Sequence, residues 1–158
     1  MKKEVCVITG GGSAWDWLLQ KYMPKEKIIL VTGRTLAKLE RAVTELQEAG
    51  YEAYAKTCDT SVRSQVQELA AYAAELGEIK NVIHAAGLSP AMADPEKLLR
   101  VNALGTVYIN QEFSKYMKAG SVIVDISSNS AYMIPGFLAK KKTFTLADTD
   151  EDLFLKNV

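Results

Sequence analysis

The sequence predicts the α/β class: a doubly wound parallel sheet of about five strands, ordered 3-2-1-4-5, in a three-layer α/β/α arrangement. Two observations predict it. Short β-branched runs alternate along the chain with helical segments of about ten residues or more, which is typical of right-handed crossovers between parallel strands. The first run also ends in Gly10, Gly11 and Gly12, a glycine cluster that stops a buried strand at a turn.

The predicted strands are short apolar runs that stop at turn signals. They cover residues 5–8, 28–32, 52–57, 81–84 and 122–126. The first two are apolar and β-branched along their length, so we expect them to be buried on both faces of the sheet.

Three helices are predicted where apolar residues recur at helical spacing. Thr35 is the expected N-cap of the first, which stops at Gly50, and the second follows Asp59. The apolar positions are Leu36, Leu39, Val43 and Leu46 in the first helix, and Val62, Val66, Leu69, Ala73 and Leu76 in the second. Asp94, followed by proline at the first helical position, begins a third helix that runs to about Met117.

The composition fits a single domain. The 158 residues are 48% hydrophobic, enough for one sizeable core. Nineteen basic residues balance nineteen acidic ones, so nothing points to nucleic acid or an anionic membrane as a partner. The apolar run at 5–8 is too short for a signal peptide or a membrane span. Cys6 and Cys58 lack metal-ligand or disulfide spacing, so we expect buried free thiols in a cytoplasmic protein.

Functional residues are expected beyond the carboxyl ends of the strands, where the strand order reverses between the first and the fourth. The first strand is followed by Gly10, Gly12 and Ser13, whose backbone N–H groups can approach a pyrophosphate closely. Glycine clusters also mark ordinary turns, so this interpretation depends on the position of the cluster in the fold.

The residues after the second strand indicate the kind of dinucleotide. An acidic side chain there would bind the ribose of NAD, but the sequence has Arg34 followed by Thr35. A guanidinium suits the 2′-phosphate of NADP in charge and in forked geometry, so we predict NADP rather than NAD as the cofactor. The alternative is that Arg34 is a solvated arginine at a helix start.

Small residues also follow the fourth strand. Ala85, Ala86 and Gly87 would let a ribose and a nicotinamide pass close to the backbone. His84, which precedes them, is the single histidine of the chain. We expect its imidazole to be hydrogen-bonded to the backbone at the strand end rather than to act as a base.

Five separated motifs, in this order, resemble the short-chain dehydrogenase/reductase family over the chain up to about Pro135. They are Thr9-Gly10-Gly11-Gly12-Ser13, Asp59, Ala85-Ala86-Gly87, Val101-Asn102-Ala103-Leu104-Gly105 and Ile126-Ser127-Ser128. The resemblance implies a Rossmann-type NAD(P)-binding domain over residues 1–138 and the start of an incomplete C-terminal segment over 139–158. His84 stands where the family usually has asparagine.

The resemblance also implies roles for individual residues. Asp59 would meet the adenine, the turn at 85–87 would line the ribose, and Asn102 would help to hold a proton-relay water. Ser128 would hydrogen-bond the carbonyl or hydroxyl of the substrate. The alternatives for these four features are a helix-capping aspartate, a tight turn, a helix-embedded amide and a serine-rich loop.

The glycine loop departs from the family pattern T-G-x-x-x-G-x-G. Ala14, Trp15, Asp16 and Trp17 follow Ser13, and two bulky rings and a carboxylate would crowd and repel a pyrophosphate. We therefore predict weakened cofactor binding. Back-translation of these four residues with one G restored in front reads Gly, a hydrophobic residue, Gly and Leu, so we hypothesise a paired frameshift. DNA resequencing that found the written codons intact in related genomic copies would count against it.

A second departure concerns the reaction itself. The family uses a tyrosine followed four residues later by a lysine, with the phenol as general acid or base and the lysine lowering its pKa. None of the seven tyrosines has a lysine at that spacing, and the chain stops at Val158, after residues 149–152 have opened a new helix. We expect a truncated chain that is nearly inactive alone, because losing a positioned acid or base slows a reaction by ~10² to 10⁴.

The leading hypothesis is an oxidoreductase that transfers hydride between nicotinamide and a secondary alcohol or ketone, with Ser128 and Asn102 as the catalytic residues present. The alternatives are a Rossmann-fold protein that binds or senses NAD(P) without turnover, and an inert folded fragment. A Tyr-x-x-x-Lys motif directly downstream in the gene would favour the enzyme. Family members commonly pair through the long helix that begins here at Pro95, so we also expect a homo-oligomer.

Overall fold

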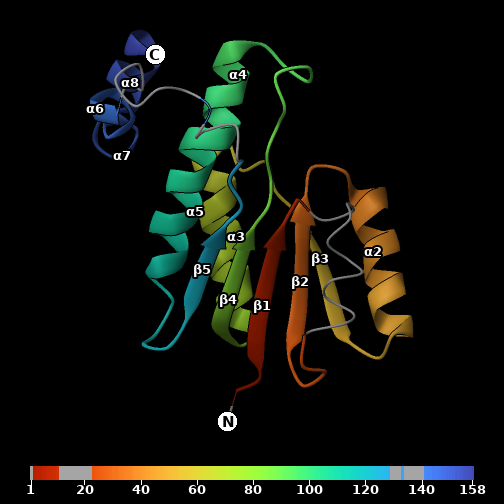
Figure 1. Cartoon of the computed structure of the whole chain (residues 1–158). Coiled ribbons are helices and arrows are strands. Elements are labelled where there is room, and N and C mark those ends of the chain that lie inside the picture. The colour runs from red at the N-terminus through yellow and green to blue at the C-terminus, as the bar shows by residue number, and fades with distance from the viewer. Residues whose placement is uncertain (1, 11–22, 129–132, 134–140) are drawn as a thin grey trace.

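The computed structural model describes residues 2–10, 23–128, 133 and 141–158. Its centre is one parallel sheet with the strand order β3-β2-β1-β4-β5, as the sequence predicted (Figure 1). The strands are β1 (Glu4–Thr9), β2 (Ile28–Gly33), β3 (Glu52–Thr57), β4 (Glu78–His84) and β5 (Val122–Asp125). Gly12, Ser13 and the residues at 14–17, on which the sequence analysis placed a phosphate loop, lie outside the described residues.

Strand β4 begins three residues earlier than the sequence predicts. Glu78 and Ile79 pair with Glu4 and Val5 of β1, and Glu78 and Lys80 form an ion pair at 2.8 Å. These charged residues at the start of β4 interrupt the apolar pattern, which is why the sequence pattern began only at Asn81.

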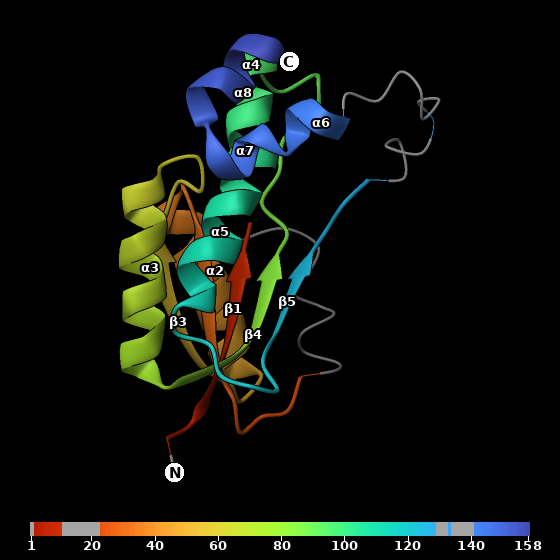
Figure 2. The same cartoon turned by 90° about the vertical axis from the view of Figure 1, so that its left-hand side faces the viewer.

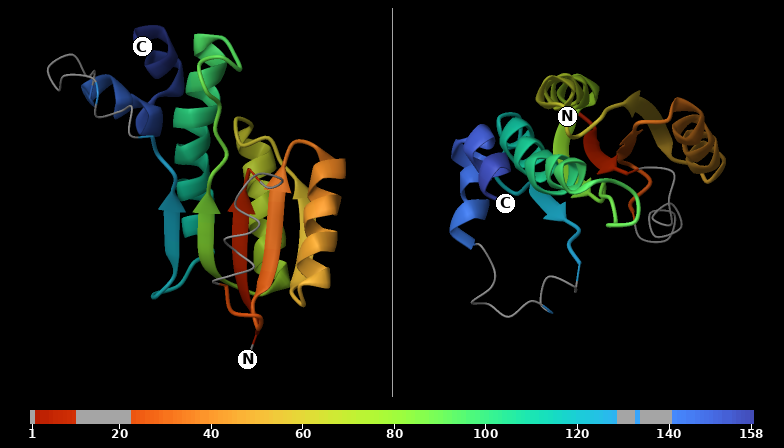
Figure 3. Two further views of the ribbon diagram at one scale, coloured as in Figure 1. Left: turned by 45° about the vertical axis from the view of Figure 1, so that its right-hand side comes forward. Right: turned by 90° about the horizontal axis from the view of Figure 1, so that it is seen from above.

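Helices cover the sheet in two layers. Seen from above in Figure 3, α3 (Arg63–Leu76) and α5 (Gly105–Ser114) lie on one face, and α2 (Leu36–Glu48) lies on the other. The first face buries Val5 and Val7 of β1, and the second buries Cys6 and Ile8 of the same strand. The doubly wound arrangement follows from this alternation, because successive side chains of a strand point to opposite faces.

The third predicted helix is interrupted. Asp94 caps α4 (Pro95–Leu99) as predicted, since its carboxylate accepts a hydrogen bond from the Lys97 N–H at 2.9 Å. A π-helical turn, η1 (Arg100–Leu104), then separates α4 from α5, which ends at Ser114 rather than near Met117. Single π-turns inside helices are frequent at functional sites, and this one carries Asn102.

Neither the predicted cap Thr35 nor the alternative cap Asp59 caps its helix through its side chain. Thr35 is at the N-cap position of α2, but its side chain makes no cap hydrogen bond. The N-cap of α3 is Val62, so Asp59 does not cap that helix. Val62 is correspondingly exposed, while Val66, Leu69 and Ala73 are buried as predicted.

Three short helices follow the sheet: α6 (Lys141–Phe144), α7 (Leu146–Thr149) and α8 (Glu151–Asn157). Figure 2 shows α7 and α8 beside α5, and Phe154 and Ala147 are buried in the same core cluster as Tyr108 of α5. Within α8, Phe154 is fully buried, Leu155 packs against the core, and Leu153 stays exposed.

Polar contacts fix these helices to the first face of the domain. The Tyr108 hydroxyl donates to the Glu151 carboxylate at 2.6 Å, and the Gln111 side-chain amide donates to Asp148 at 2.5 Å. Arg63, the first residue of α3, lies 3.0 Å from the buried Glu112 carboxylate and 3.4 Å from that of Glu151.

Among the described residues no helix combines the length and the apolar character needed to cross a membrane.

Candidate functional site

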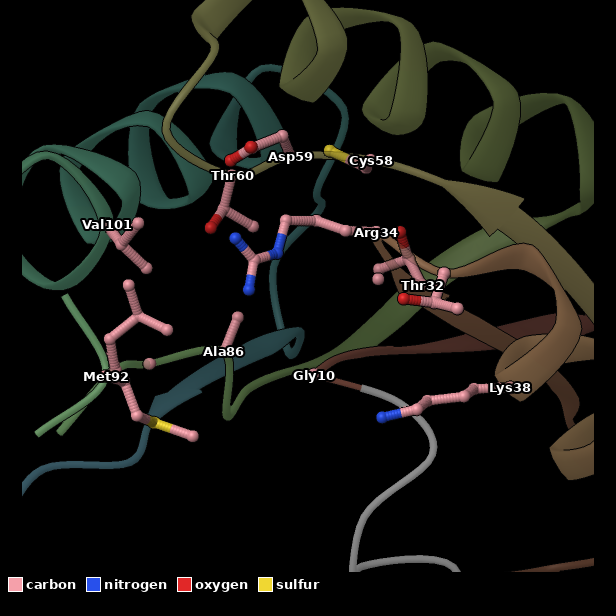
Figure 4. Close-up of a pocket in the computed structure, with 14 residues that line it drawn as sticks. Gly10, Thr32, Arg34, Lys38, Cys58, Asp59, Thr60, Ala86, Met92 and Val101 are labelled. Atoms are coloured by element: carbon pink, nitrogen blue, oxygen red, sulfur yellow. The ribbon is translucent and has the colours of Figure 1, made fainter. Parts of the chain in front are cut away.

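A cavity of about 270 Å³ opens beyond the carboxyl ends of β1 to β4 (Figure 4). This is the place where ligands bind in open parallel sheets, because the loops from neighbouring strands diverge there. The described residues that line it come from the ends of four strands and the turns after them. They are Gly10; Thr32, Gly33, Arg34, Thr35 and Lys38; Cys58, Asp59 and Thr60; and Ala86, Gly87, Leu88, Met92 and Val101.

Two cations reach this cavity from the β2–α2 turn. Figure 4 shows the guanidinium of Arg34 extending across the cavity toward Thr60 and Ala86, and the ammonium of Lys38 on the side nearer Gly10. The sequence predicted a site role for Arg34 but gave no signal for Lys38, which lies in the first turn of α2.

Thr32 adds a polar group to the same wall. Its side chain is fully buried at the end of β2, and its hydroxyl has no hydrogen-bond partner among the described residues. A buried hydroxyl normally finds a partner, so an unpaired one on a cavity wall fits a site that receives a polar ligand group. Together with Arg34 and Lys38 it makes this wall suited to an anionic, hydroxyl-bearing ligand.

Asp59 lines the opposite wall, after β3. Its carboxylate accepts hydrogen bonds from the backbone N–H of Ser61 at 3.0 Å and from the Ser61 hydroxyl at 2.7 Å. The backbone N–H of Asp59 donates to the side chain of Gln65 at 2.8 Å. These contacts hold the β3–α3 turn, so Asp59 is fixed at the cavity edge by a local turn rather than by a helix cap.

Gly10 closes the floor of the cavity. Its φ of +77° lies in the left-handed region, and a Cβ built on it would lie 2.9 Å from the Ala85 carbonyl oxygen and 3.0 Å from the Ala86 nitrogen. A side chain here would therefore collide with the turn after β4. Glycine at this position lets the β1 and β4 turns approach to backbone distance, which is the close approach that a dinucleotide site needs.

Thr9 and His84 pair side by side at the ends of β1 and β4, and both are buried. The Thr9 hydroxyl lies 2.7 Å from the His84 Nδ1 and also accepts from the backbone N–H groups of Ala85 and Ala86. The imidazole therefore bonds to a side chain, and the expectation of a backbone partner is wrong. Burial lowers the pKa of His84, and the nearby Asp125 opposes this shift.

Asn102 joins the turn after β4 to the π-turn. Its side-chain oxygen accepts from the Leu88 N–H at 2.8 Å, and its side-chain nitrogen donates to the Leu88 carbonyl at 2.8 Å. The amide thus has defined contacts and is not simply embedded in a helix. A carboxamide has two lone pairs and two N–H groups, so one acceptor and one donor position remain for a water or a ligand.

Ser128 follows β5 and is exposed. It does not line the cavity described above, but β5 pairs with β4, so both strands end at the same edge of the sheet. Residues 129–132 and 134–140 lie outside the described residues. Within the part of the chain that the structure describes, no tyrosine lines the cavity.

Both cysteines are buried and free, as the sequence predicted. Burial raises the pKa of each thiol to about 12, so neither is a thiolate nucleophile near neutral pH. The chemistry of the site therefore lies in its cations and its hydroxyl groups.

Comparison with known proteins links this site to one family. The family model described as short chain dehydrogenase matches residues 4–139. The short-chain dehydrogenase/reductase bsc3 of Alternaria brassicicola is 28% identical over 134 residues, which is 85% of this chain and 48% of that protein. The chain thus spans about half the length of this curated relative.

Solved structures agree in fold. The citronellol catabolism dehydrogenase AtuB of Pseudomonas aeruginosa is 28% identical with a TM-score of 0.72, over 84% of this chain and 59% of that one. A short-chain type dehydrogenase/reductase from Mycobacterium ulcerans has a TM-score of 0.71 at 24% identity, over 81% and 52% of the two chains. Actinorhodin polyketide ketoreductase, solved with NADPH, has a TM-score of 0.71 at 23% identity, over 92% and 60%. At these identities the last two show the fold alone.

Proposed function

The chain belongs to the short-chain dehydrogenase family, and on that premise we propose that it is the nucleotide-binding part of an NADP-dependent oxidoreductase. The reaction proposed is hydride transfer between the nicotinamide and a secondary alcohol or ketone. The observation that carries the cofactor assignment is the pair of cations, Arg34 and Lys38, on the wall of the cavity after β2.

The residues present fit NADP better than NAD. Arg34 can bind a 2′-phosphate with two parallel hydrogen bonds, and Lys38 adds a second positive charge on the same wall. Among the residues that the structure describes, no acidic side chain lines the β2 side of the cavity, where the ribose of NAD would need one. A ketoreductase of the same fold was solved with NADPH, which supports a nicotinamide cofactor in this fold.

The remaining wall residues suit the rest of a dinucleotide. Asp59 and Thr60 would lie beside the adenine, and Ala86 and Gly87 would lie along the ribose next to the nicotinamide. Gly10 keeps the floor low enough for the pyrophosphate to approach backbone N–H groups. When bound, the nicotinamide supplies or accepts the hydride.

Two residues of this chain would act on the substrate side. The Ser128 hydroxyl would hydrogen-bond the carbonyl or hydroxyl of the substrate, where it follows β5. The second lone pair of the Asn102 side-chain oxygen and the second N–H of its nitrogen would hold a water on the proton path, while the same two atoms also bind Leu88. We propose that this chain alone turns over slowly, because no tyrosine in its sequence has a lysine four residues later.

That last observation also favours a second candidate function. A Rossmann-fold protein that binds NADP without turning it over would need the cavity and its cations but not a general acid. Turnover separates the two candidates: hydride transfer to a ketone above the buffer rate favours the enzyme, and tight binding with no transfer favours the binding protein.

The proposed cofactor is tested by titrating the purified chain with NADPH and NADH and following nucleotide fluorescence. We expect NADPH to bind at least about tenfold more tightly than NADH, as one additional charge-assisted contact is worth roughly 1.5–3 kcal/mol. Equal affinities, or tighter binding of NADH, would overturn the NADP assignment. Failure of both nucleotides to bind would overturn the proposed function itself.

A further inference from the structure

The Thr9 hydroxyl is the meeting point of three hydrogen bonds at the edge of the cavity. It accepts from the backbone N–H of Ala85 at 3.2 Å and from that of Ala86 at 3.1 Å, and it lies 2.7 Å from the His84 Nδ1. Because a hydroxyl has two lone pairs and one proton, the two N–H groups use both lone pairs. The remaining proton is therefore donated to Nδ1.

This arrangement fixes the state of the imidazole. A ring whose Nδ1 accepts a hydrogen bond carries its proton on Nε2 and is neutral. Nε2 is buried and has no hydrogen-bond partner among the described residues. The surroundings of His84 therefore favour the neutral ring, since a charged ring would be buried without a second acceptor.

The same bonds hold a wall of the cavity. Ala86, Gly87 and Leu88 line it, and the Thr9 hydroxyl binds the backbone at the start of this turn while Asn102 binds it at Leu88. The turn is thus held at two points. The Thr9 contact depends on the protonation state of His84, whereas the Asn102 contact does not.

We propose that neutral His84 is a positioning residue that holds the turn at 85–88 in its nucleotide-binding form through Thr9, and that proton uptake by His84 releases this turn. This control of the turn by His84 rests on the proposed function, because the ligand whose binding it regulates is NADP. A protonated Nδ1 would present an N–H to the Thr9 hydroxyl oxygen, whose lone pairs are already used. At least one of the hydrogen bonds that this oxygen accepts from the backbone N–H groups of Ala85 and Ala86 must then break.

Among the described residues, one charged group, Asp125, acts on the ring and opposes the effect of burial on the His84 pKa. On β5, Asp125 pairs with His84 and is the charged group that acts on the ring, while the side chain of Asn110 on α5 binds the Asp125 carboxylate at 2.9 Å. On β1 the neighbour is the uncharged Thr9. No ionisable residue of α3 or α5, the helices packed on this face, is among the charges acting on the ring; these residues are Arg63, Glu68, Tyr72, Glu75, Tyr108 and Glu112.

The direction of the effect follows from linkage. Burial lowers the pKa of His84 below its usual value of about 6.5, so the folded, nucleotide-binding form takes up the proton only at lower pH. Affinity for the nucleotide is then full above about pH 6.5 and falls as the pH drops through the His84 pKa. By reciprocity, bound nucleotide lowers the His84 pKa further.

The test compares the wild-type chain with His84→Asn by calorimetric titration with NADP⁺ between pH 5 and 8. Asparagine can accept the Thr9 proton but does not titrate, and the titration of the 2′-phosphate itself is common to both chains. We expect wild-type affinity to fall about tenfold at one pH unit below the His84 pKa, relative to His84→Asn. Parallel pH profiles of the two chains would overturn the proposal.

A second measurement does not depend on nucleotide binding. His84 is the single histidine, so one imidazole signal in the NMR spectrum reports its pKa without assignment. We expect amide exchange at Ala85 and Ala86 to speed up as that signal titrates, and exchange at Leu88 to change less. If the amide exchange rates at Ala85 and Ala86 do not change as His84 titrates, the proposal is overturned. This result is distinct from a failure to bind NADP⁺, which would overturn the proposed function.

Discussion

The side chain of Asn102 binds both backbone polar groups of Leu88, with its oxygen 2.8 Å from the Leu88 nitrogen and its nitrogen 2.8 Å from the Leu88 carbonyl oxygen. This two-point contact spans the π-turn of η1 and the turn after β4. A regular α-helix would place the same side chain at a different angle, because side-chain direction follows the helical period. The irregular helix and the wall of the cavity are therefore parts of one arrangement.

Replacing Asn102 with alanine is expected to loosen the turn at Leu88. Two hydrogen bonds are lost, but both are exposed enough for water to replace them, so the free energy of unfolding should fall by only about 1 kcal/mol. Amide exchange at Leu88 should accelerate clearly. Asn102→Asp is the control, since it keeps the acceptor for the Leu88 N–H and loses the donor. Unchanged Leu88 exchange in both variants would contradict the contact.

Gly10→Ala tests the close approach of the β1 and β4 turns. The new methyl would lie 2.9 Å from the Ala85 carbonyl oxygen, in addition to the strain of a left-handed φ. Gly120→Ala is a matched control, because Gly120 has a φ of +83° and no neighbour within 4 Å of its Cβ position. Urea unfolding should show a loss of about 1–2 kcal/mol for Gly120→Ala, from strain alone, and a larger loss for Gly10→Ala. Equal losses would mean that the contact with β4 is not tight.

Charge removal at the cavity wall tests the cofactor preference. Arg34→Ala and Lys38→Ala should each weaken NADPH binding by roughly tenfold and change NADH binding little, because the lost contacts are to the 2′-phosphate. Arg41→Ala is the control, since Arg41 is an exposed residue of the same helix that does not line the cavity. Fluorescence titration measures all three. Equal weakening of NADPH and NADH would contradict the assignment of these cations to the phosphate.

Arg63→Ala should destabilise the domain by about 2 kcal/mol. Among the described residues, it leaves the buried Glu112 carboxylate with Lys115 as its ion-pair partner, and it removes the ion pair to Glu151. The expected loss is below that of a fully buried pair because Arg63 is 37% exposed and Lys115 remains. Arg100→Ala, which breaks an exposed pair with Glu96, should change urea unfolding by less than about 0.5 kcal/mol. Similar losses for the two variants would contradict a special role for Arg63.

The pH dependence of the same region has a defined sign. Burial of Glu112 opposes its ionisation, but Lys115 and Arg63 outweigh burial and hold the pKa of its carboxyl below the usual value. The carboxylate therefore stabilises the fold above about pH 4.5, and this contribution is lost as the pH falls through the lowered pKa. Without Arg63 that loss should begin at higher pH, which urea unfolding between pH 3 and 6 would reveal.

The strands and the strand order were predictable because most of the strands contain an apolar run bounded by turns, and parallel connections allow few topologies. The start of β4 was not, because Glu78 pairs with Glu4 of β1 and forms an ion pair with Lys80, and the apolar pattern cannot show either contact. The partner of His84 was missed for a related reason. It depends on the register between β1 and β4, which places Thr9 beside it.

The candidate site was predictable in part. Arg34, Asp59, Gly87 and their neighbours could be placed because they follow strand ends, and the structure brings them to one cavity. Lys38 was missed because its place on the wall depends on the direction in which α2 leaves the sheet. The contacts of α6 to α8 with Arg63 and Tyr108 join residues far apart in the sequence, and no local pattern signals them.

The central claim, that this cavity binds NADP, is tested most directly by mapping NADP⁺ binding onto the backbone amides of the labelled chain by NMR. We predict saturable shifts at Gly33, Arg34, Thr60, Ala86 and Gly87, and none at Gly120, which lies in the turn before β5 at the opposite ends of the strands. Shifts confined to residues outside the cavity, or no shifts at millimolar nucleotide, would contradict it.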